Sequence, residues 1–284
     1  MEIIEKAPAK INLGLDVLYK RDDGYHELEM VMSSIDLADH LTFRTLEKDE
    51  IIIETDNSFL PLDERNHIYQ AAMLLKRECS ITKGVHVQMQ KRIPVAAGMA
   101  GGSSDAAATL RGLNRLWKLK LSLEELAELG EKVGSDVPYC IYGNTAYVRG
   151  KGEKIEFLPK VPQCWVVLVK PRLSVSTGTV FHNLKLEQLV HPDIQGIKES
   201  IKQQNFKKMV SSLGNSLEAV TVQNYPIVGF LKEKMQQFGA DVAVMSGSGP
   251  TVFALCEKRS RAQRVCNGLK GFCEEVYLIR TLNK

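Results

Sequence analysis

The stretch PVAAGMAGGSSDAAA at residues 94–108 is the most informative segment of the chain. Its glycines lack Cβ atoms, so the backbone can take positive φ angles and come close to a ligand. We expect Ser103, Ser104 and Asp105 to cap a helix whose first turn is rich in alanine. A glycine-rich loop that leads into a helix presents free N–H groups and the positive end of the helix dipole. The segment therefore predicts a phosphate site, and a tight strand–helix connection that merely needs glycine is the simpler alternative.

The best-known phosphate-binding motifs are absent from this segment. No Gly-Lys-Ser/Thr ends it, and neither the G-x-G-x-x-G pattern nor the H-R-D and D-F-G signatures of protein kinases is present. The hydrolase pattern G-x-S-x-G fits neither Ser246 nor Ser248, because positions 244 and 246 hold valine and serine. Phosphate binding is therefore expected in a different fold.

The composition is that of a folded globular protein. Of 284 residues, 44% are hydrophobic and 25% are charged, which excludes disorder, collagen and a disulfide scaffold. Six cysteines without C-x-x-C spacing give zinc or thioredoxin-like chemistry no support and predict a reduced, cytoplasmic protein. The chain opens without a signal-peptide pattern, and no stretch reaches the roughly 18 apolar residues of a membrane span. We therefore expect no membrane partner.

The periodicity of apolar residues predicts an α+β fold with a β-rich start. Expected strands lie at 11–17, onward to Phe43, and at 51–54, 85–89, 144–148, 165–169, 241–246 and 251–256. Expected helices lie at 66–79 with Asn66 as N-cap, at 106–117, after a capping box of Ser122 and Glu125, and near 196–212 and 225–238, with a last helix and strand beyond. A proline-containing stretch at 157–163 predicts a domain boundary.

A second cluster of small residues, MSGSGPTV at 245–252, lies between two expected strands. A hairpin turn is the simpler interpretation. The functional interpretation is another backbone cradle that meets the same ligand from the second half of the chain. Both stay open at this point.

Two charged residues are candidates for chemistry. Asp136, in VGSDVP at 133–138, can cap a helix that has Pro138 in its first turn, or it can accept a hydroxyl proton. Lys10 follows Ala7, Pro8 and Ala9 and would normally be a solvated strand lysine. Its small neighbours would also let it hold a phosphate or a carboxylate.

Three aromatic side chains complete the set of candidates. Tyr25 and His26 combine a stacking ring with an imidazole next to a turn at Gly24, although half-buried packing is the simpler explanation. Phe181 is most simply a core aromatic.

Three of these segments together resemble the motifs of the galactokinase–homoserine kinase–mevalonate kinase–phosphomevalonate kinase superfamily. They are APAKINL at 7–13, PVAAGMAGGSSDAA at 94–107 and MSGSGPTVF at 245–253, in the family's order. RDDGYHEL at 21–28 narrows the resemblance to members that phosphorylate 4-diphosphocytidyl-2-C-methyl-D-erythritol in the non-mevalonate isoprenoid pathway. The resemblance implies a two-domain α+β small-molecule kinase fold, with an ATP-binding and catalytic domain at 1–158, a second domain at 159–284, and the active site in the cleft between them.

The resemblance also implies a role for each candidate residue. Asp136 would deprotonate or orient the attacking 2-hydroxyl, and Lys10 would hold both in place. Tyr25 and Phe181 would stack on cytosine while His26 reads its hydrogen-bonding edge. The whole set that would bind the diphosphocytidyl part is Asn12, Tyr25, His26, Thr177 and Phe181.

The nucleotide side of the site follows from the same resemblance, with ATP as co-substrate together with Mg²⁺. The loop that would wrap the ATP phosphates consists of Pro94, Val95, Ala96, Ala97, Gly98, Met99, Ala100, Gly101, Gly102, Ser103 and Ser104. The third motif contributes Ser246, Gly247, Ser248 and Gly249. No carboxylate matches a Mg²⁺ ligand, so the ion would ride on ATP with water, within reach of Ser103 or Ser104.

RNA binding is the alternative function from a different class. Residues 1–142 carry 17 Lys and Arg against 23 Asp and Glu, whereas residues 143–284 carry 20 against 11. The N-terminal fold of the superfamily is shared with ribosomal proteins, and a basic half could serve RNA. However, the basic stretches at 198–208 and 258–264 resemble solvated helix faces, and no RNP-type motif accompanies them. We therefore expect small-molecule substrates and no nucleic acid.

Overall fold

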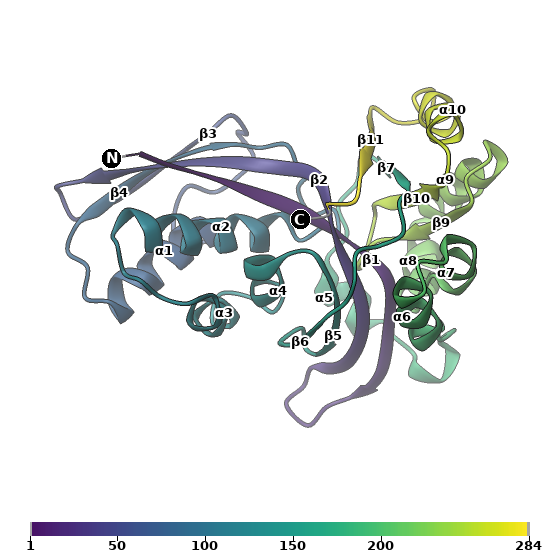
Figure 1. Ribbon diagram of the computed structural model, residues 1–284, viewed down its shortest axis with the longest axis horizontal. Helices are drawn as coiled ribbons and strands as arrows, with labels where there is room; N and C mark the ends of the chain where they lie inside the picture. The colour runs from purple at the N-terminus through teal and green to yellow at the C-terminus, as the bar shows by residue number, and fades with distance from the viewer. Residues whose placement is uncertain (1, 283–284) are drawn as a thin grey trace. The chain divides into compact units, whose positions relative to one another are not determined.

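The computed structural model describes residues 2–282, which form two compact units (Figure 1). Unit 1 consists of residues 2–9, Leu37–Pro94 and Ala100–Gly143, and unit 2 consists of Lys10–Asp36, Val95–Met99 and 144–282. The long strands β1 (Glu2–Lys20) and β2 (His26–Leu46) therefore contribute to both. The expected α+β class is confirmed, while the domain division at residue 158 stays a prediction. Within residues 2–282, no helix combines the length and the apolar character needed to cross a membrane.

Unit 1 is a sheet covered by helices on one face (Figure 1). Strand β4 (Gly84–Gln90) lies between β2, which is antiparallel to it, and β3 (Ile51–Thr55), which is parallel. The helices are α1 (His67–Glu78), α2 (Gly101–Leu116), α3 (Leu123–Glu131) and α4 (Val137–Tyr142). Helix α2 packs against the other three and approaches the sheet at Gly112, where a Cβ would lie 2.5 Å from the buried ring of Phe43.

Local signals set some helix starts in unit 1 and not others. Asn66 caps α1 by accepting the N–H of Ile68 at 2.9 Å, and Ser122 and Glu125 form the expected capping box. The prediction that Ser103, Ser104 and Asp105 cap α2 is wrong. The helix begins at Gly101 after Ala100, which is left-handed (φ 54°) and makes no side-chain cap, so the three polar residues already lie inside the helix.

Unit 2 contains a four-stranded antiparallel sheet in the order β11-β7-β10-β9. Its helices α9 and α10 pack on this sheet. The strands of the unit, apart from its parts of β1 and β2, are β5 (Thr145–Gly150), β6 (Lys154–Phe157), β7 (Trp165–Lys170), β8 (Gly214–Asn215), β9 (Val242–Met245), β10 (Val252–Cys256) and β11 (Glu275–Arg280). The helices are α5 (Thr177–His182), a 3₁₀ turn η1 (Leu186–Gln188), α6 (Ile194–Lys202), α7 (Phe206–Ser212), α8 (Glu218–Asn224), α9 (Pro226–Gln237) and α10 (Arg259–Leu269).

The helix expected at 196–212 is in fact two helices, α6 and α7. Gln204 between them has a φ of 53°, which a continuous right-handed helix cannot contain. The basic faces of α6 and α10 are opposed by buried apolar residues, as expected for solvated helix faces. Elements α5, α8 and β6 are too short for the apolar periodicity to reveal them.

Candidate active site

The glycine-rich loop at 94–104 holds its backbone in conformations that most residues avoid. Ala96, Gly98 and Ala100 have φ angles of 51°, 70° and 54°. A left-handed conformation costs a non-glycine residue about 1–2 kcal/mol, so Ala96 and Ala100 are held there by their surroundings. Ala97 and Met99 are buried and anchor the loop between these positions. Strain of this kind often accompanies a functional loop.

The loop runs directly into the N-terminus of α2. The first hydrogen bond of the helix joins the N–H of Ser104 to the carbonyl of Ala100 at 2.8 Å. The N–H groups of Gly101, Gly102 and Ser103 therefore precede the ladder and have no acceptor within the helix. No acidic residue lies in this first turn, so the positive end of the helix dipole is available to an anion.

Lys10 lies in a network that joins all three sequence motifs within unit 2. Its side chain is 4% exposed, so the expectation of an ordinary solvated lysine is wrong. The Nζ atom donates to Asn12 Oδ1 at 2.7 Å and to the carbonyl of Gly98 at 3.4 Å. Asn12 Oδ1 also accepts the N–H of Gly247 at 3.1 Å, and Ser246 Oγ donates to the carbonyl of Gly98 at 3.0 Å. Asn12 thus orients Lys10 from inside the unit.

The third motif is the turn of a hairpin. It joins β9 to β10, which pair antiparallel with Met245 opposite Val252, so the hairpin interpretation is confirmed. Asn215, which no pattern in the sequence singles out, donates to the carbonyls of Met245 and Gly247, both at 2.8 Å. A Cβ on Gly98 would lie 2.2 Å from the carbonyl oxygen of Ser246, so the turn and the loop touch through their backbones. A direct contact of this turn with a ligand stays a prediction.

Two of the three aromatic candidates, His26 and Phe181, lie next to each other. The rings of His26 and Phe181 lie 5.1 Å apart at 32°. Phe181 is half-buried on α5, so the core interpretation is wrong for it. Burial, with Lys20 nearby, lowers the pKa of His26 below its ordinary value, which keeps the imidazole neutral near pH 7. Tyr25 is 59% exposed and has the ammonium of Lys151 5.1 Å from its ring centroid.

Thr177 lies beside the third motif. Its hydroxyl forms a hydrogen bond of 2.8 Å with that of Ser248, although Thr177 itself is exposed at the start of α5. The structure therefore connects one predicted substrate residue with the hairpin turn.

Asp136 stands at the N-cap position of α4, with Pro138 in the first turn as expected. Its side chain makes no capping hydrogen bond, so the capping interpretation fails. Arg111 donates to the carbonyls of Cys140 and Ile141 near the end of α4 and holds the helix on α2. Asp136 belongs to unit 1 and Lys10 to unit 2, and their predicted partnership stays a prediction.

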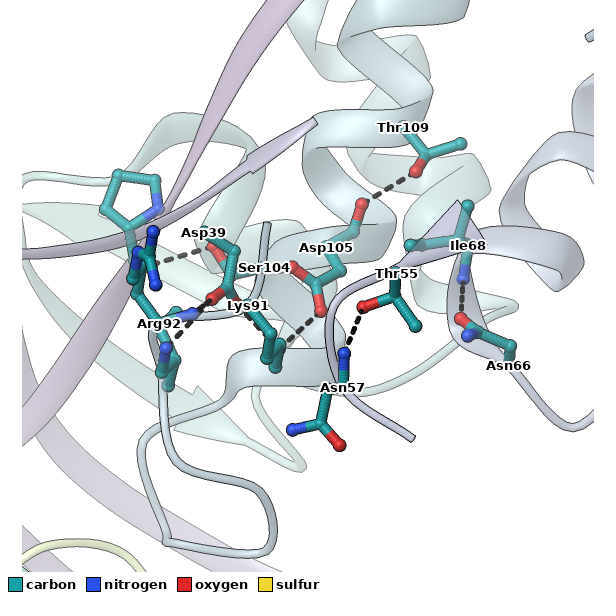
Figure 2. Close-up of polar contacts among 12 residues, drawn as sticks. Asp39, Thr55, Asn57, Asn66, Ile68, Lys91, Arg92, Ser104, Asp105 and Thr109 are labelled. Atoms are coloured by element: carbon teal, nitrogen blue, oxygen red, sulfur yellow. Dashed lines mark hydrogen bonds and ion pairs between the residues drawn. The ribbon is translucent and has the colours of Figure 1, made fainter. Parts of the chain in front are cut away.

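Unit 1 also contains a buried ion cluster that no sequence motif indicates, formed by Asp39, Lys91 and Asp105 (Figure 2). Lys91 lies shortly before the glycine-rich loop, and Asp105 directly follows its last residue. The only local signal was a carboxylate on an otherwise alanine-rich helix start. The partnership with Asp39 has no signature in the sequence.

Few side chains in the structure suit a metal ion. Among residues 2–282, no three His, Cys, Asp or Glu side chains gather in a way that could hold one. Ser104 Oγ is buried and donates to the carbonyl of Pro8 at 2.7 Å. Of the two serines considered for Mg²⁺, Ser103 is the one that is not fully buried.

Two family models and many named relatives match this chain. The N-terminal domain of the GHMP kinases matches residues 66–144, and the GHMP kinase C-terminal domain matches residues 187–275. A 4-diphosphocytidyl-2-C-methyl-D-erythritol kinase of Enterococcus faecalis is 64% identical over 282 residues, covering 99% of this chain and 100% of its own. The enzyme of the same name from Bacillus subtilis is 55% identical over 284 residues, covering 100% and 98%.

Solved structures agree with these matches. The crystal structure of a 4-(cytidine 5'-diphospho)-2C-methyl-D-erythritol kinase superposes with a TM-score of 0.84 at 30% identity, covering all of both chains. A homoserine kinase from Cytophaga hutchinsonii has a TM-score of 0.79 at 20% identity, covering 98% and 95%. The mevalonate kinase of L. major has a TM-score of 0.76 at 16% identity, covering 100% and 96%. These last two structures show that the fold is shared.

Proposed function

The chain belongs to the GHMP kinases, and within them to the 4-diphosphocytidyl-2-C-methyl-D-erythritol kinases, and on this basis we propose its reaction and the role of each site residue. It is an ATP-dependent kinase that phosphorylates the 2-hydroxyl of 4-diphosphocytidyl-2-C-methyl-D-erythritol in the non-mevalonate isoprenoid pathway. The observation that carries this assignment is the 64% identity to a kinase of that name over nearly the whole chain.

The loop at 94–104 is the binding site for the ATP phosphates in this proposal. The N–H groups of Gly101, Gly102 and Ser103 at the start of α2 supply hydrogen-bond donors where negative charge has to be held. The third motif, from Ser246 to Gly249, supports the loop through the contact with Gly98. Phosphoryl transfer depends mainly on positioning and on neutralising charge, which is what a rigid cradle of backbone donors provides.

Lys10 and Asp136 serve the transfer itself. The 2-oxygen of the substrate forms a bond to the γ-phosphorus, and the bond from that phosphorus to the bridging oxygen breaks, so that the electron pair leaves on ADP. The hydroxyl proton passes to Asp136. Lys10, held by Asn12, neutralises charge on the transferred group. A single positioned acid–base group contributes about 10²–10⁴-fold to such a rate.

Mg²⁺ accompanies ATP in this proposal. The ion would offset negative charge on the phosphates, with Ser103 as the protein hydroxyl best placed to contact it and water as the main ligand. Ser104 remains a structural residue, because both its hydroxyl and its N–H already have partners inside unit 1.

The cytidine part of the acceptor is recognised by the residues around His26. Its neutral imidazole can both donate and accept a hydrogen bond at the edge of cytosine. Phe181 beside it, and the exposed ring of Tyr25, offer faces for stacking. Asn12 and Thr177 complete the set that binds the diphosphocytidyl part, and they also form hydrogen bonds with Lys10 and Ser248, respectively.

Two further properties belong to the proposal. We place the protein in the cytoplasm, where its six cysteines would stay reduced as thiols. We also propose that it binds no nucleic acid. The alternative of RNA binding finds no support in the relatives from Enterococcus faecalis and Bacillus subtilis, which are kinases.

A coupled assay of ADP release tests the reaction. ADP should form with 4-diphosphocytidyl-2-C-methyl-D-erythritol and not with homoserine or mevalonate. Asp136→Ala should lower kcat by about 10²–10⁴-fold while circular dichroism and thermal unfolding match the parent. Preference for homoserine or mevalonate would move the chain to another branch of the family.

A further inference from the structure

The ion cluster of Lys91 is one of the most deeply buried charged groups of unit 1. Lys91 Nζ lies 2.6 Å from Asp39 Oδ2 and 2.6 Å from Asp105 Oδ2. The three side chains are only 5%, 0% and 4% exposed, respectively. Figure 2 shows the lysine between the two carboxylates. A buried ion cluster often stabilises a protein no more than apolar side chains of the same volume would. Its presence here therefore suggests a role other than stability.

The cluster joins the two ends of the glycine-rich loop. Asp39 Oδ1 accepts the N–H groups of Arg92 at 2.5 Å and Ile93 at 2.8 Å, the residues immediately before the loop. Asp105 is the residue immediately after it and lies on α2. Lys91 bonds to both carboxylates at once, so it ties the strand that leads into the loop to the helix that leads out.

The ammonium group also lies directly behind the helix start that is proposed to hold phosphate. A Cβ on Gly101 would come within 3.3 Å of Lys91 Nζ, so the first turn of α2 rests on this group. Thr109, fully buried one turn further along, donates to the backbone carbonyl of Asp105 at 2.8 Å within α2. Lys91 is thus in contact with the first turn of the helix, which its neighbours hold in place.

The cluster places the ammonium of Lys91 close to the start of α2. Asp105 Oδ1 is buried and has no hydrogen-bond partner among residues 2–282. Burial raises the pKa of Asp105, and the ammonium of Lys91 opposes this shift. Burial alone would lower the pKa of Lys91, but the facing carboxylates Asp105 and Asp39 raise it, so the ammonium stays charged. The ammonium of Lys91 therefore offsets negative charge of the carboxyl groups that lie behind the proposed phosphate site.

We propose that Lys91, together with Asp39 and Asp105, is the positioning residue for the ATP loop, fixing both ends of the segment 94–104 so that the first-turn N–H groups of α2 face the phosphates. This inference rests on the proposed function, which assigns ATP to that loop. It adds a role for three residues that contact the nucleotide only through the loop.

A matched pair of lysine variants tests the proposal. Lys76 is also buried in unit 1 and pairs with Asp49, but its other hydrogen bond goes to the carbonyl of Lys83, away from the loop. Lys91→Met should raise the KM for ATP at least tenfold and change the KM for the diphosphocytidyl acceptor less than threefold. Lys76→Met should leave both KM values within twofold. Equal losses in the two variants, or equal effects on both substrates, would overturn the proposal.

A second pair keeps the test decisive if Lys91→Met fails to fold. Asp105→Ala removes the acceptor on α2 and should raise the KM for ATP, whereas Asp105→Asn, which keeps a side-chain oxygen that can accept from Lys91, should restore it to within threefold. In nucleotide-free protein, the Ser104 amide should exchange its hydrogen at least fivefold faster in Asp105→Ala than in the parent or in Lys76→Met. Unchanged exchange would overturn the positioning role of Lys91, whatever the kinase assay shows. A parent protein that phosphorylates nothing would rule out the proposed function, and the exchange measurement would still test the positioning role.

Discussion

Two glycine-rich segments of this kinase have similar compositions and different structures. The segment 94–104 exposes Val95, Ala96 and Gly102 and ends at the start of a helix. The segment 245–250 is buried throughout and joins two antiparallel strands. Glycine content alone would assign them the same role.

What separates the segments is where their polar groups go. In the second segment, side chains of unit 2 form hydrogen bonds with the backbone carbonyls. Asn215 donates to two of these carbonyls, and Thr221 donates to the carbonyl of Ser248. In the first, the N–H groups at the start of α2 have no acceptor within the helix. In the proposed function the first segment binds phosphate and the second supports it, and changes to single residues put this contrast to the test.

The largest effect is expected at Gly98, where the segments touch. Gly98→Ala would place a Cβ 2.2 Å from the carbonyl of Ser246 at a φ of 70°, so both overpacking and backbone strain apply. We expect the free energy of unfolding to fall by about 3 kcal/mol and ATP turnover to be lost with it. Urea denaturation measures the former.

Gly24 provides the control for this change. It has a φ of 85°, but a Cβ added there would meet nothing within 4 Å, so Gly24→Ala carries only the backbone cost of about 1 kcal/mol. If Gly24→Ala and Gly98→Ala lower the free energy of unfolding equally, the close contact between the two segments does not contribute to stability.

A smaller effect, on activity alone, is expected at Gly102. This glycine is exposed in the first turn of α2, where alanine suits the helix and only the ring of His67 has to yield. Gly102→Ala should keep the free energy of unfolding within about 1 kcal/mol of the parent. It should raise the KM for ATP about tenfold, equivalent to about 1.4 kcal/mol, because in the proposed function phosphate binds to the backbone at this residue. Unchanged steady-state kinetics would argue that phosphate binds elsewhere.

Ser246→Ala should lower stability and leave the KM for ATP nearly unchanged, the opposite of Gly102→Ala. It removes one hydrogen bond from a fully buried hydroxyl to the carbonyl of Gly98, so it should lower the free energy of unfolding by about 1 kcal/mol. The KM for ATP should change little, because the hydroxyl supports the loop from behind. A large rise in that KM with unchanged stability would give the second segment a direct part in binding.

The smallest effect expected is on the response to pH. Neither segment contains a titratable side chain, so the pH dependence of binding should arise elsewhere, at His26. Because its pKa lies below the ordinary 6.5, the imidazole is half protonated only at a pH below 6.5. The KM for the diphosphocytidyl acceptor should therefore rise in acid with a midpoint below pH 6.5, and His26→Asn should flatten that rise. A midpoint above pH 6.5 would mean that the histidine is not shielded.

Local features of the fold could be predicted from the sequence, because neighbouring residues determine them. The cap at Asn66 and the capping box of Ser122 and Glu125 involve partners two or three residues apart. The start of α2 could not be predicted in this way. Serines are good N-caps, but the helix begins before them, after the left-handed residue Ala100.

The candidate site was predictable only where motifs carry it. The small residues before Lys10 suggested a lysine that holds a phosphate or a carboxylate; the lysine is buried beside Asn12, and that role stays a prediction. The partners of Lys91 lie 52 and 14 residues away along the chain, and nothing in either local pattern specifies the pairing. A buried ion cluster formed by distant residues becomes visible only once the fold brings them together.

Glycine-selective ¹⁵N labelling gives the sharpest test of the contrast between the two segments. The chain has 21 glycines, and single variants can assign the resonances of Gly101, Gly102, Gly247 and Gly249. On addition of ADP with Mg²⁺, we expect large shifts for Gly101 and Gly102 and small ones for Gly247 and Gly249. Large shifts confined to Gly247 and Gly249, with Gly101 and Gly102 unmoved, would show that the second segment, and not the first, is the one that binds.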